Sequence, residues 1–335
     1  MTVRARLATG AAGFAVLAMA VAACSSSGGS SSGGGGASAA PAAALTNISV
    51  GTSGATGVYL PVYVGVQTGL FKRYGLNVTV ESLTPTAVTA ATLSNNVNIG
   101  WDGPGLVSGI LSNPSAKVIF SAGPTAFYIY GQKGISSVKD LKGKTVAVTT
   151  PGGAIDTAVR TAITNAGLKP GTDVKIAYLQ TNQAALAAVE DGSVQAAGVS
   201  PPTSIQATQA GLVDVENITP LSPPSVLAVN SQWASSNSAA IAKFITAFKA
   251  AVKLAATNET DAANALKTYV KLTSQAQIEG TWQEYKTVWV VEPYPTNEMQ
   301  ILLKGLADGN PPVKSAATAS ISSLIDNQYI GAAGS

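Results

Sequence analysis

The sequence predicts an α/β protein of two lobes, and three observations support this fold class. Short β-prone segments alternate with helix-like segments from residue 47 onwards, which is typical of βαβ units and parallel sheets. The same alternation starts again at residue 144, so we expect two consecutive lobes. The chain has 335 residues, of which 46% are apolar, and this is enough for a sizeable buried core.

In the first lobe, apolar strand segments end in loops of small residues. A Thr-Ser-Gly-Ala-Thr-Gly loop at 52–57 separates the first strand from an apolar helix. We expect strands at 48–51, 77–81, 97–100 and 117–120, and helices at 59–70, 86–94 and 106–111.

The second lobe repeats this pattern, and the chain after residue 229 becomes helical. One apolar face at 3,4 spacing is formed by residues Ile241, Phe244, Ile245, Phe248 and Val252. We expect second-lobe strands at 145–148, 174–179 and 195–199, second-lobe helices at 155–166 and 183–189 with 206–211 closing the unit, and C-terminal helices around 241–252 and at 260–271, 275–286, 297–305 and 316–326.

The composition excludes most catalytic chemistry. The chain has no His and one Cys, so it has no Ser-His-Asp or Cys-His site and no Cys-cluster zinc site. We therefore expect no enzyme activity, no cofactor and no metal. Removing Arg4 and Arg6, which lie in a segment expected to be cleaved, from the net charge of +3 leaves +1. A near-neutral chain without a basic run predicts no nucleic-acid binding.

The N-terminus is typical of an exported lipoprotein. Residues 1–24 combine the basic Arg4 and Arg6 with an apolar stretch, and Val-Ala-Ala-Cys at 21–24 resembles a lipobox. We expect cleavage before Cys24 and lipid attachment to it; the alternative is an ordinary secretory signal with an incidental Cys. Residues 25–44 are Ser, Gly, Ala and one Pro, which predicts a flexible tether.

Four loops at the carboxyl ends of predicted strands are the candidate ligand site, because ligands of open parallel sheets bind there. They are rich in Gly, Ser, Thr and Pro, which offer backbone donors and hydroxyls for reversible binding. The candidate ligand-binding residues in these loops are Ser53, Gly54, Thr56, Trp101, Asp102, Gly103, Thr150, Gly152, Gly153, Ser200 and Pro201.

Each candidate also has a purely structural interpretation. Trp101 is either a stacking surface or a core residue, and Asp102 either orients a ligand amine or hydroxyl or caps the next helix. The Gly152-Gly153 pair either offers backbone donors to an anion or only supplies positive φ. Arg160 is interpreted as a surface ion-pair partner rather than an anion clamp, and an acid in the first turn of its helix weakens the anion site.

Several motifs resemble the substrate-binding proteins of ABC importers of the nitrate/sulfonate/taurine type, the NMT1/THI5-like family. The resemblance covers about residues 47–219, and the Asp-Leu-Lys-Gly-Lys segment is its most specific part. The motifs are GLFKRYGLNV at 69–78, VNIG at 97–100, DLKGKTVAV at 140–148, NAGL at 165–168 and ALAAVEDGSVQAA at 185–197.

This resemblance implies a two-lobed periplasmic-binding-protein (type II) fold, each lobe a mainly parallel sheet flanked by helices. By the same resemblance, one lobe comprises 45–126 plus 229–335, the other comprises 132–224, and hinge strands lie near 126–131 and 225–230. The ligand is then held between the lobes, which close by hinge motion. The resemblance also implies that Tyr59 and Thr125 reach the cleft as ligand-binding residues.

The implied function is that of an extracytoplasmic solute-binding component of an ABC importer. We expect it to capture a small organic molecule of sulfonate-, nitrate- or pyrimidine-like class and to pass it to permease subunits. We expect a monomer on the extracytoplasmic face of the bacterial cell membrane, lipid-anchored through Cys24. The alternatives are an enzyme on the same scaffold, related to pyrimidine-precursor synthases, and an extracellular ligand sensor.

The chain departs from the family pattern at four places. Ser200-Pro201-Pro202 stands where many members carry a Trp/Asp-Pro element. Asn98 and Gln195 stand where the family has acids, and Gly152-Gly153 lacks the hydroxyl of the family's helix start. Only Arg73 and Arg160 remain as arginines after the leader, so a small hard anion has no evident clamp. These departures favour a neutral or mixed-charge organic ligand with a flat portion that stacks on Trp101.

Overall fold

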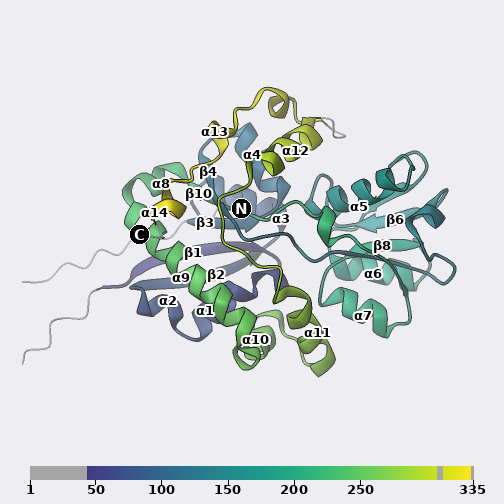
Figure 1. Ribbon diagram of the computed structural model, residues 1–335, viewed down its shortest axis with the longest axis horizontal. Helices are drawn as coiled ribbons and strands as arrows, with labels where there is room; N and C mark the ends of the chain where they lie inside the picture. The colour runs from purple at the N-terminus through teal and green to yellow at the C-terminus, as the bar shows by residue number, and fades with distance from the viewer. Residues whose placement is uncertain (1–43, 308–311, 333–335) are drawn as a thin grey trace, which may run out of the picture. The chain divides into compact units, whose positions relative to one another are not determined.

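The computed structural model describes residues 44–307 and 312–332, and these form two five-stranded sheets flanked by helices (Figure 1). The expected leader 1–24, the lipidation site Cys24 and the tether up to residue 43 lie outside the described residues. Among the described residues, no helix is long and apolar enough to cross a membrane.

The first sheet is parallel except for one inserted strand. Its order is β2-β1-β3-β10-β4, and only β10 runs antiparallel to its neighbours. The strands are β1 (Thr46–Ser53), β2 (Leu76–Leu83), β3 (Ile99–Asp102), β4 (Ala116–Ser121) and β10 (Val226–Asn230).

The second sheet repeats this plan in the order β7-β6-β8-β5-β9. Here β5 is the single antiparallel strand, so both sheets are mainly parallel, as predicted. The alternation of Val213 and Val215 with Asp214 and Glu216 is typical of the strand β9, which the sequence analysis missed. The strands are β5 (Tyr128–Gly131), β6 (Thr145–Val148), β7 (Lys175–Tyr178), β8 (Ala196–Val199) and β9 (Val213–Asn217).

The chain passes between the sheets at two links. Residues 122–127 lead from β4 to β5, and residues 218–225 lead from β9 to β10. The segments 126–131 and 225–230, expected as hinge strands, therefore consist mostly of β5 and β10, each hydrogen-bonded within one sheet.

Helices follow the strands where local sequence signals begin them. Pro85 stands in the first turn of α3, and the side chains of Thr84 and Thr181 accept hydrogen bonds from backbone N–H groups at the starts of α3 and α6. The helices between the strands are η1 (Gly57–Tyr59), α1 (Leu60–Gln67), α2 (Leu70–Arg73), α3 (Pro85–Leu93), α4 (Pro104–Ser112), η2 (Val138–Leu141), α5 (Ala154–Asn165), α6 (Asn182–Glu190), α7 (Thr203–Gln209) and η3 (Thr219–Leu221).

The C-terminal part is helical, as predicted, with two differences. The expected helix 260–271 ends in a π-helical turn, and the expected helix 316–326 is divided into two short turns. The elements are α8 (Ser231–Ser236), α9 (Ser238–Thr257), α10 (Glu259–Ala265), the turn η4 (Leu266–Val270), α11 (Gln275–Tyr285), α12 (Thr296–Ala307), η5 (Lys314–Thr318), α13 (Ile321–Leu324) and α14 (Gln328–Ala332).

The long helix α9 buries its predicted apolar face. Ile241, Phe244, Ile245 and Phe248 are fully buried, and Val252 is partly buried. The ring of Phe244 stacks on Phe71, which joins α9 to α2 in the core of the first sheet.

Candidate functional site

The loop after β1 and the end of β3 are joined by a chain of hydroxyl groups that ends on a carboxylate. The Ser53 hydroxyl donates to Asp102 Oδ1 at 2.7 Å. Because that proton is used, the 2.5 Å contact between the Ser53 and Tyr59 hydroxyls has Tyr59 as its donor. The Ser53 backbone N–H donates in turn to the Tyr59 oxygen at 3.2 Å. Three of the predicted site residues are thus brought together with defined proton positions.

The Asp102 carboxyl group is partly buried and poorly solvated. Burial raises the pKa of its carboxyl from the usual 3.8 to about 6, while hydrogen bonds from Ser53 and from the Gly103 backbone oppose the shift. Burial and the Asp102 charge together raise the pKa of the Tyr59 hydroxyl, so Tyr59 stays a neutral donor. The side chain of Asp102 does not cap α4, whose first turn has Gly103 as its cap without a side-chain hydrogen bond.

The end of β3 also meets the second sheet. A Cβ atom built on Gly103 would lie 3.3 Å from the Cβ of Ala154, the first residue of α5. The loop at 150–153 precedes this residue directly. Gly103, in a predicted loop of the first sheet, therefore lies close to the start of α5, which follows the loop at 150–153 of the second sheet.

Helix α11 packs against both the loop after β1 and the loop after β8. A Cβ on Gly57 would lie 2.4 Å from Thr281 Cγ2 and 2.8 Å from the Tyr285 ring, so only glycine allows this approach. Burial raises the pKa of Tyr285 strongly, and the adjacent Ser200 hydroxyl partly offsets this. Tyr285 thus lies between Gly57 of the first loop and Ser200 of the fourth.

Several buried polar side-chain atoms near these loops have no hydrogen-bond partner among the described residues. They are Tyr285 OH and Thr281 Oγ1 on α11, Ser204 Oγ on α7, and Asn182 Oδ1, whose amide nitrogen donates to Ser200 at 2.8 Å. Helices α7 and α11 pack together, with Ile205 against Gly280. A buried polar group without a partner is costly, so such a group needs an explanation.

A second carboxylate stands on α11 beside the second sheet. The Tyr128 hydroxyl of β5 donates to Glu284 Oε2. Burial and the neighbouring Glu284 raise the pKa of Tyr128, and Asp214 on β9 contributes to the same shift. The Tyr130 hydroxyl, next on the same strand face, pairs with Thr208 of α7 at 2.8 Å. The surroundings of α11 are therefore acidic and rich in hydroxyls.

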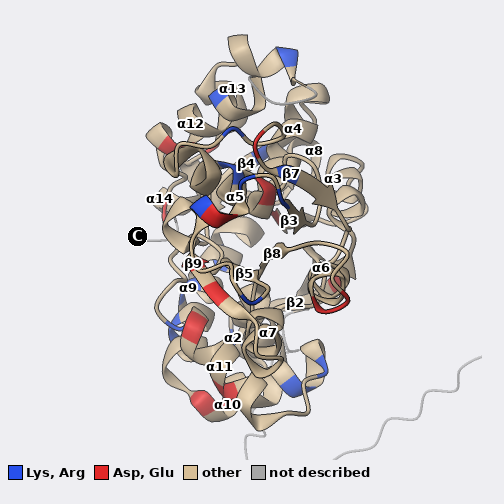
Figure 2. Ribbon diagram, turned by 90° about the vertical axis from the view of Figure 1, so that its right-hand side faces the viewer, with Lys and Arg blue, Asp and Glu red and all other residues tan. Residues whose placement is uncertain are grey.

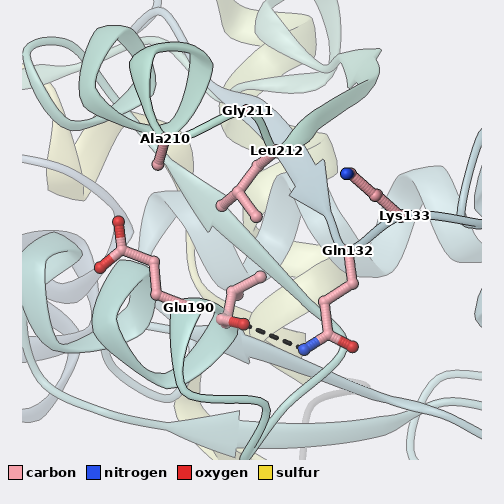
Figure 3. A pocket seen from close by; sticks show the side chains of 7 residues that line it. Gln132, Lys133, Glu190, Ala210, Gly211 and Leu212 are labelled. Atoms are coloured by element: carbon pink, nitrogen blue, oxygen red, sulfur yellow. Dashed lines mark hydrogen bonds between the residues drawn. The ribbon is translucent and has the colours of Figure 1, made fainter.

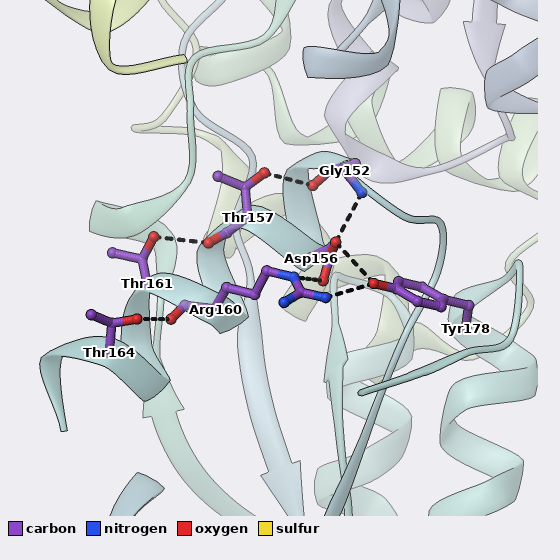
Figure 4. Close-up of polar contacts among 8 residues, drawn as sticks. Gly152, Asp156, Thr157, Arg160, Thr161, Thr164 and Tyr178 are labelled. Atoms are coloured by element: carbon purple, nitrogen blue, oxygen red, sulfur yellow. Dashed lines mark hydrogen bonds and ion pairs between the residues drawn. The ribbon is translucent and has the colours of Figure 1, made fainter. Parts of the chain in front are cut away.

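The Gly152-Gly153 turn is not a free anion site (Figure 4). Gly152 has φ +67° and donates its N–H to the buried Asp156 at 2.8 Å. Asp156 also accepts from Arg160 Nε at 2.7 Å, and the guanidinium further donates to Tyr178 at 2.7 Å. The interpretation of Arg160 as an ion-pair partner is confirmed.

Trp101 is a core residue, and its ring is not available to stack on a ligand as the sequence led us to expect. Its side chain is 0% exposed and lies edge-to-face with Tyr59 at 5.0 Å and with Phe248 at 5.2 Å between ring centroids. Its indole N–H donates to Ser225 Oγ at 3.1 Å. Because β3 is a central strand covered by α9, its apolar side chain fills the core and leaves no free ring face.

The remaining predicted site residues contribute backbone conformation or backbone hydrogen bonds to their loops. Gly54 has φ +82° in the turn after β1, and Thr56 precedes η1 without a side-chain cap. Thr150 accepts the Gly153 N–H through its backbone oxygen, and Pro201 is buried next to Ser200 and joined to Pro202 by a cis bond. Thr125 lies on the link 122–127, where its N–H donates to Ser222.

Two departures from the family pattern prove structural. Asn98 Oδ1 accepts from the backbone N–H of Ser49 at 2.9 Å, and Gln195 Oε1 accepts from that of Thr145 at 3.1 Å. Each amide oxygen thus fixes the neighbouring parallel strand in its own sheet. These hydrogen bonds give both residues a structural role within their sheets.

Pockets with described linings lie away from these loops. One of about 380 Å³ is lined by Gln132, Lys133 and Glu190 among others, and Gln132 donates to the Val189 backbone there (Figure 3). Another of about 460 Å³ lies beside β2 and α3. Charged side chains are sparse and form no basic stripe in the view of Figure 2.

The sequence analysis missed Asn182, Ser204, Thr281, Glu284 and Tyr285. Asn182 is the first residue of α6, the helix that follows β7, so the rule that ligands bind at carboxyl ends of strands could have pointed to it. The three residues of α11 carry no such signal, because their side of the helix is decided by contacts with distant segments. No group of three or more metal-ligating side chains occurs in residues 44–307 and 312–332.

Two mainly parallel sheets, linked twice and facing each other with strand-end loops, define the architecture of periplasmic binding proteins. The model of the protein family described as "NMT1/THI5 like" matches residues 57–262, and the chain belongs to this family. No curated protein matches the sequence.

Solved structures show the same fold. The periplasmic aliphatic sulphonate binding protein SsuA from Escherichia coli has a TM-score of 0.70 at 19% identity, with 84% of this chain and 92% of that chain covered. The periplasmic nitrate-binding protein NrtA from Synechocystis PCC 6803 has a TM-score of 0.73 at 14% identity, with 87% and 88% covered. The alkanesulfonate-binding protein SsuA from Xanthomonas axonopodis pv. citri, bound to MOPS, has a TM-score of 0.67 at 17% identity, with 79% and 92% covered.

Proposed function

We propose that this chain is the solute-binding component of an ABC importer, working on the extracytoplasmic face of the cell membrane. It captures a small organic molecule between its two lobes, without chemical conversion, and passes it to permease subunits. A lipid on Cys24 holds it near the membrane through the tether 25–44. The proposal draws on the family and on the fold shared with sulfonate- and nitrate-binding proteins.

One observation carries the proposal. Loops from both sheets meet at Gly103 and Ala154, and α11 lies between Gly57 and Ser200. Buried polar atoms of Ser204 on α7, Thr281 on α11 and Asn182, whose amide donates to Ser200, lack partners among the described residues. A solute with polar groups would supply the missing partners and would contact both lobes at once, which stabilises the closed arrangement.

The hinge belongs to the two links, 122–127 and 218–225. Both are short, and each is held by side-chain hydrogen bonds, as between Thr125 and Ser222. Under this proposal, the lobes comprise 45–126 with 229–335 and 132–224, the links form the ends of these ranges, and bending at the links changes the distance between the facing loops.

Thermal unfolding of the full chain in mild detergent tests the proposal. Nitrate, sulfonates, amines, pyrimidines and sugars are added one at a time. A solute at 100 times its dissociation constant should add about 2.7 kcal/mol, which corresponds to a rise of about 5–10 °C. A chemically altered product released from a bound solute would contradict the non-catalytic role.

A further inference from the structure

The hydroxyl chain at the end of β3 has a fixed direction. Protons point from the Ser53 backbone to Tyr59, from Tyr59 to Ser53 Oγ, and from Ser53 Oγ to Asp102. Every donor in the chain is used, so its end presents only acceptors. Ser53 is the one side chain whose hydrogen bond to Asp102 is found among the described residues, and the second carboxylate oxygen, Oδ2, accepts from no described side chain.

The carboxylate has no counter-cation in the described part of the chain. The ion pair that the structure shows there is Arg160 with Asp156 on α5, and neither Lys nor Arg contributes to the pKa of Asp102. Glu284 on α11 accepts a hydrogen bond from the neutral Tyr128 hydroxyl. A partly buried carboxylate without a cation is unfavourable unless another positive group completes it.

A buried hydroxyl without a partner lies on the helix packed against the loop that carries Tyr59. Thr281 is 0% exposed, and its oxygen has no partner among the described residues, whereas the equally buried Tyr285 hydroxyl has Ser200 beside it. Both side chains lie against Gly57, two residues before Tyr59. The hydroxyl groups and the carboxylate are therefore presented by neighbouring segments.

We propose that the solute carries a cationic nitrogen, a protonated amine or a related group, which pairs with Asp102 and is oriented by the Ser53–Tyr59 hydroxyl chain. The proposal rests on the solute-binding role proposed above and names the class of solute. A nitrate or sulfonate group placed at Asp102 would meet a like charge, so an anionic group of the same solute has to lie elsewhere. A metal ion is a poor alternative, since the described residues offer no cluster of ligating side chains.

The test compares capture by three forms of the full chain: the unaltered protein, Asp102→Asn and Glu279→Gln. The Asn side chain keeps an oxygen for Ser53, removes the charge and replaces the other carboxylate oxygen by an amide NH2. Glu279 is an exposed carboxylate on α11, so its variant removes the same charge outside the site. Each protein is incubated with a small-molecule extract of bacterial cells and their medium, washed, and denatured, and the released compounds are identified by mass spectrometry.

We expect the unaltered protein and Glu279→Gln to enrich the same compounds, all with a basic nitrogen. Asp102→Asn should lose at least about thirtyfold in capture, the usual consequence of removing one partner of a buried charge pair. Benzylamine and benzyl alcohol are added as a matched pair. The unaltered protein should capture more of the amine than of the alcohol.

Two results would overturn the inference while leaving the solute-binding role intact. One is enrichment of acids without a basic nitrogen, and the other is equal capture by Asp102→Asn. If no compound is enriched by any of the three folded proteins, the solute-binding role itself fails, and the inference fails with it.

Discussion

Replacing Asp102 by Asn should make the protein more stable at neutral pH while removing its ability to bind solute. Burial raises the pKa of Asp102 to about 6, so the folded protein favours the protonated carboxyl more than the unfolded chain does. The charged form therefore costs folding free energy at pH 7. Asn has the same shape, accepts the Ser53 hydrogen bond and carries no charge.

The magnitude follows from the pKa. The difference between 3.8 and about 6 corresponds to about 3 kcal/mol as an upper value. Asp102 is partly exposed, and its charged form makes a stronger hydrogen bond to Ser53 than Asn does, so we expect a gain of about 1–3 kcal/mol. This corresponds to a rise in melting temperature of about 2–12 °C.

The direction of the pKa shift determines how the effect of Asp102→Asn on stability changes with pH. Because the pKa is higher in the folded state, this carboxyl stabilises the fold below about pH 4, and that contribution is lost as the pH rises through about 6. The variant should therefore match the unaltered protein at pH 4 and exceed it at pH 7.5. Tyr59 is neutral throughout this range, since its pKa is raised.

Urea unfolding of both proteins at pH 4 and pH 7.5 measures this effect, with Glu279→Gln as the control for loss of one negative charge. A variant that is less stable than the unaltered protein at pH 7.5 would refute the reasoning. That result would mean that the hydrogen bonds to the Asp102 carboxylate outweigh its desolvation.

Three further predictions concern packing and anchoring. Gly57→Ala should lower stability by about 1–3 kcal/mol in thermal unfolding, because the added methyl would lie 2.4 Å from a side-chain carbon of α11; Gly305→Ala, which meets open space, is the control, and equal effects would contradict the contact. Trp101→Phe and Ser225→Ala should each cost about 1–3 kcal/mol in urea unfolding, and the double variant should cost less than their sum because both remove one hydrogen bond; full additivity would argue against that bond. Cys24→Ser should abolish incorporation of a labelled fatty acid into the protein in cells, and retained label would contradict lipidation.

The two sheets could be predicted because their signals are local. Strand segments are short, apolar and followed by small-residue loops. For this reason the sequence alone places Ser53, Asp102 and Gly103 at strand ends, where ligands of open parallel sheets bind. Strand β9 was missed because its alternation is brief and its residues Asp214 and Glu216 are charged.

The roles of individual side chains depended on distant contacts. Trp101 reads equally well as a stacking surface or a core residue until Ser225, far along the chain, accepts its indole proton and Phe248 covers it. Tyr285 and Thr281 sit on a helix whose position follows only from its contact with Gly57. Local sequence carries no information on such pairs.

The departures from the family pattern show the same limit. Asn98 and Gln195 look like changes of charge that could affect a ligand, but their amide oxygens hold neighbouring strands at Ser49 and Thr145. Only the structure shows that an acceptor is all that these positions need.

The most direct test of capture between two lobes is a disulfide lock. Cysteines at Gly103 and Ala154 would bring their Cβ atoms to about the distance that a disulfide requires, since the built Cβ of Gly103 lies 3.3 Å from that of Ala154. The full chain carrying both cysteines is loaded from the small-molecule extract, oxidised, and dialysed, and the retained compounds are measured by mass spectrometry. Our account predicts that the oxidised protein retains its solute while the reduced protein and each single-cysteine variant lose it. Equal loss from the oxidised and reduced forms would contradict binding between the lobes.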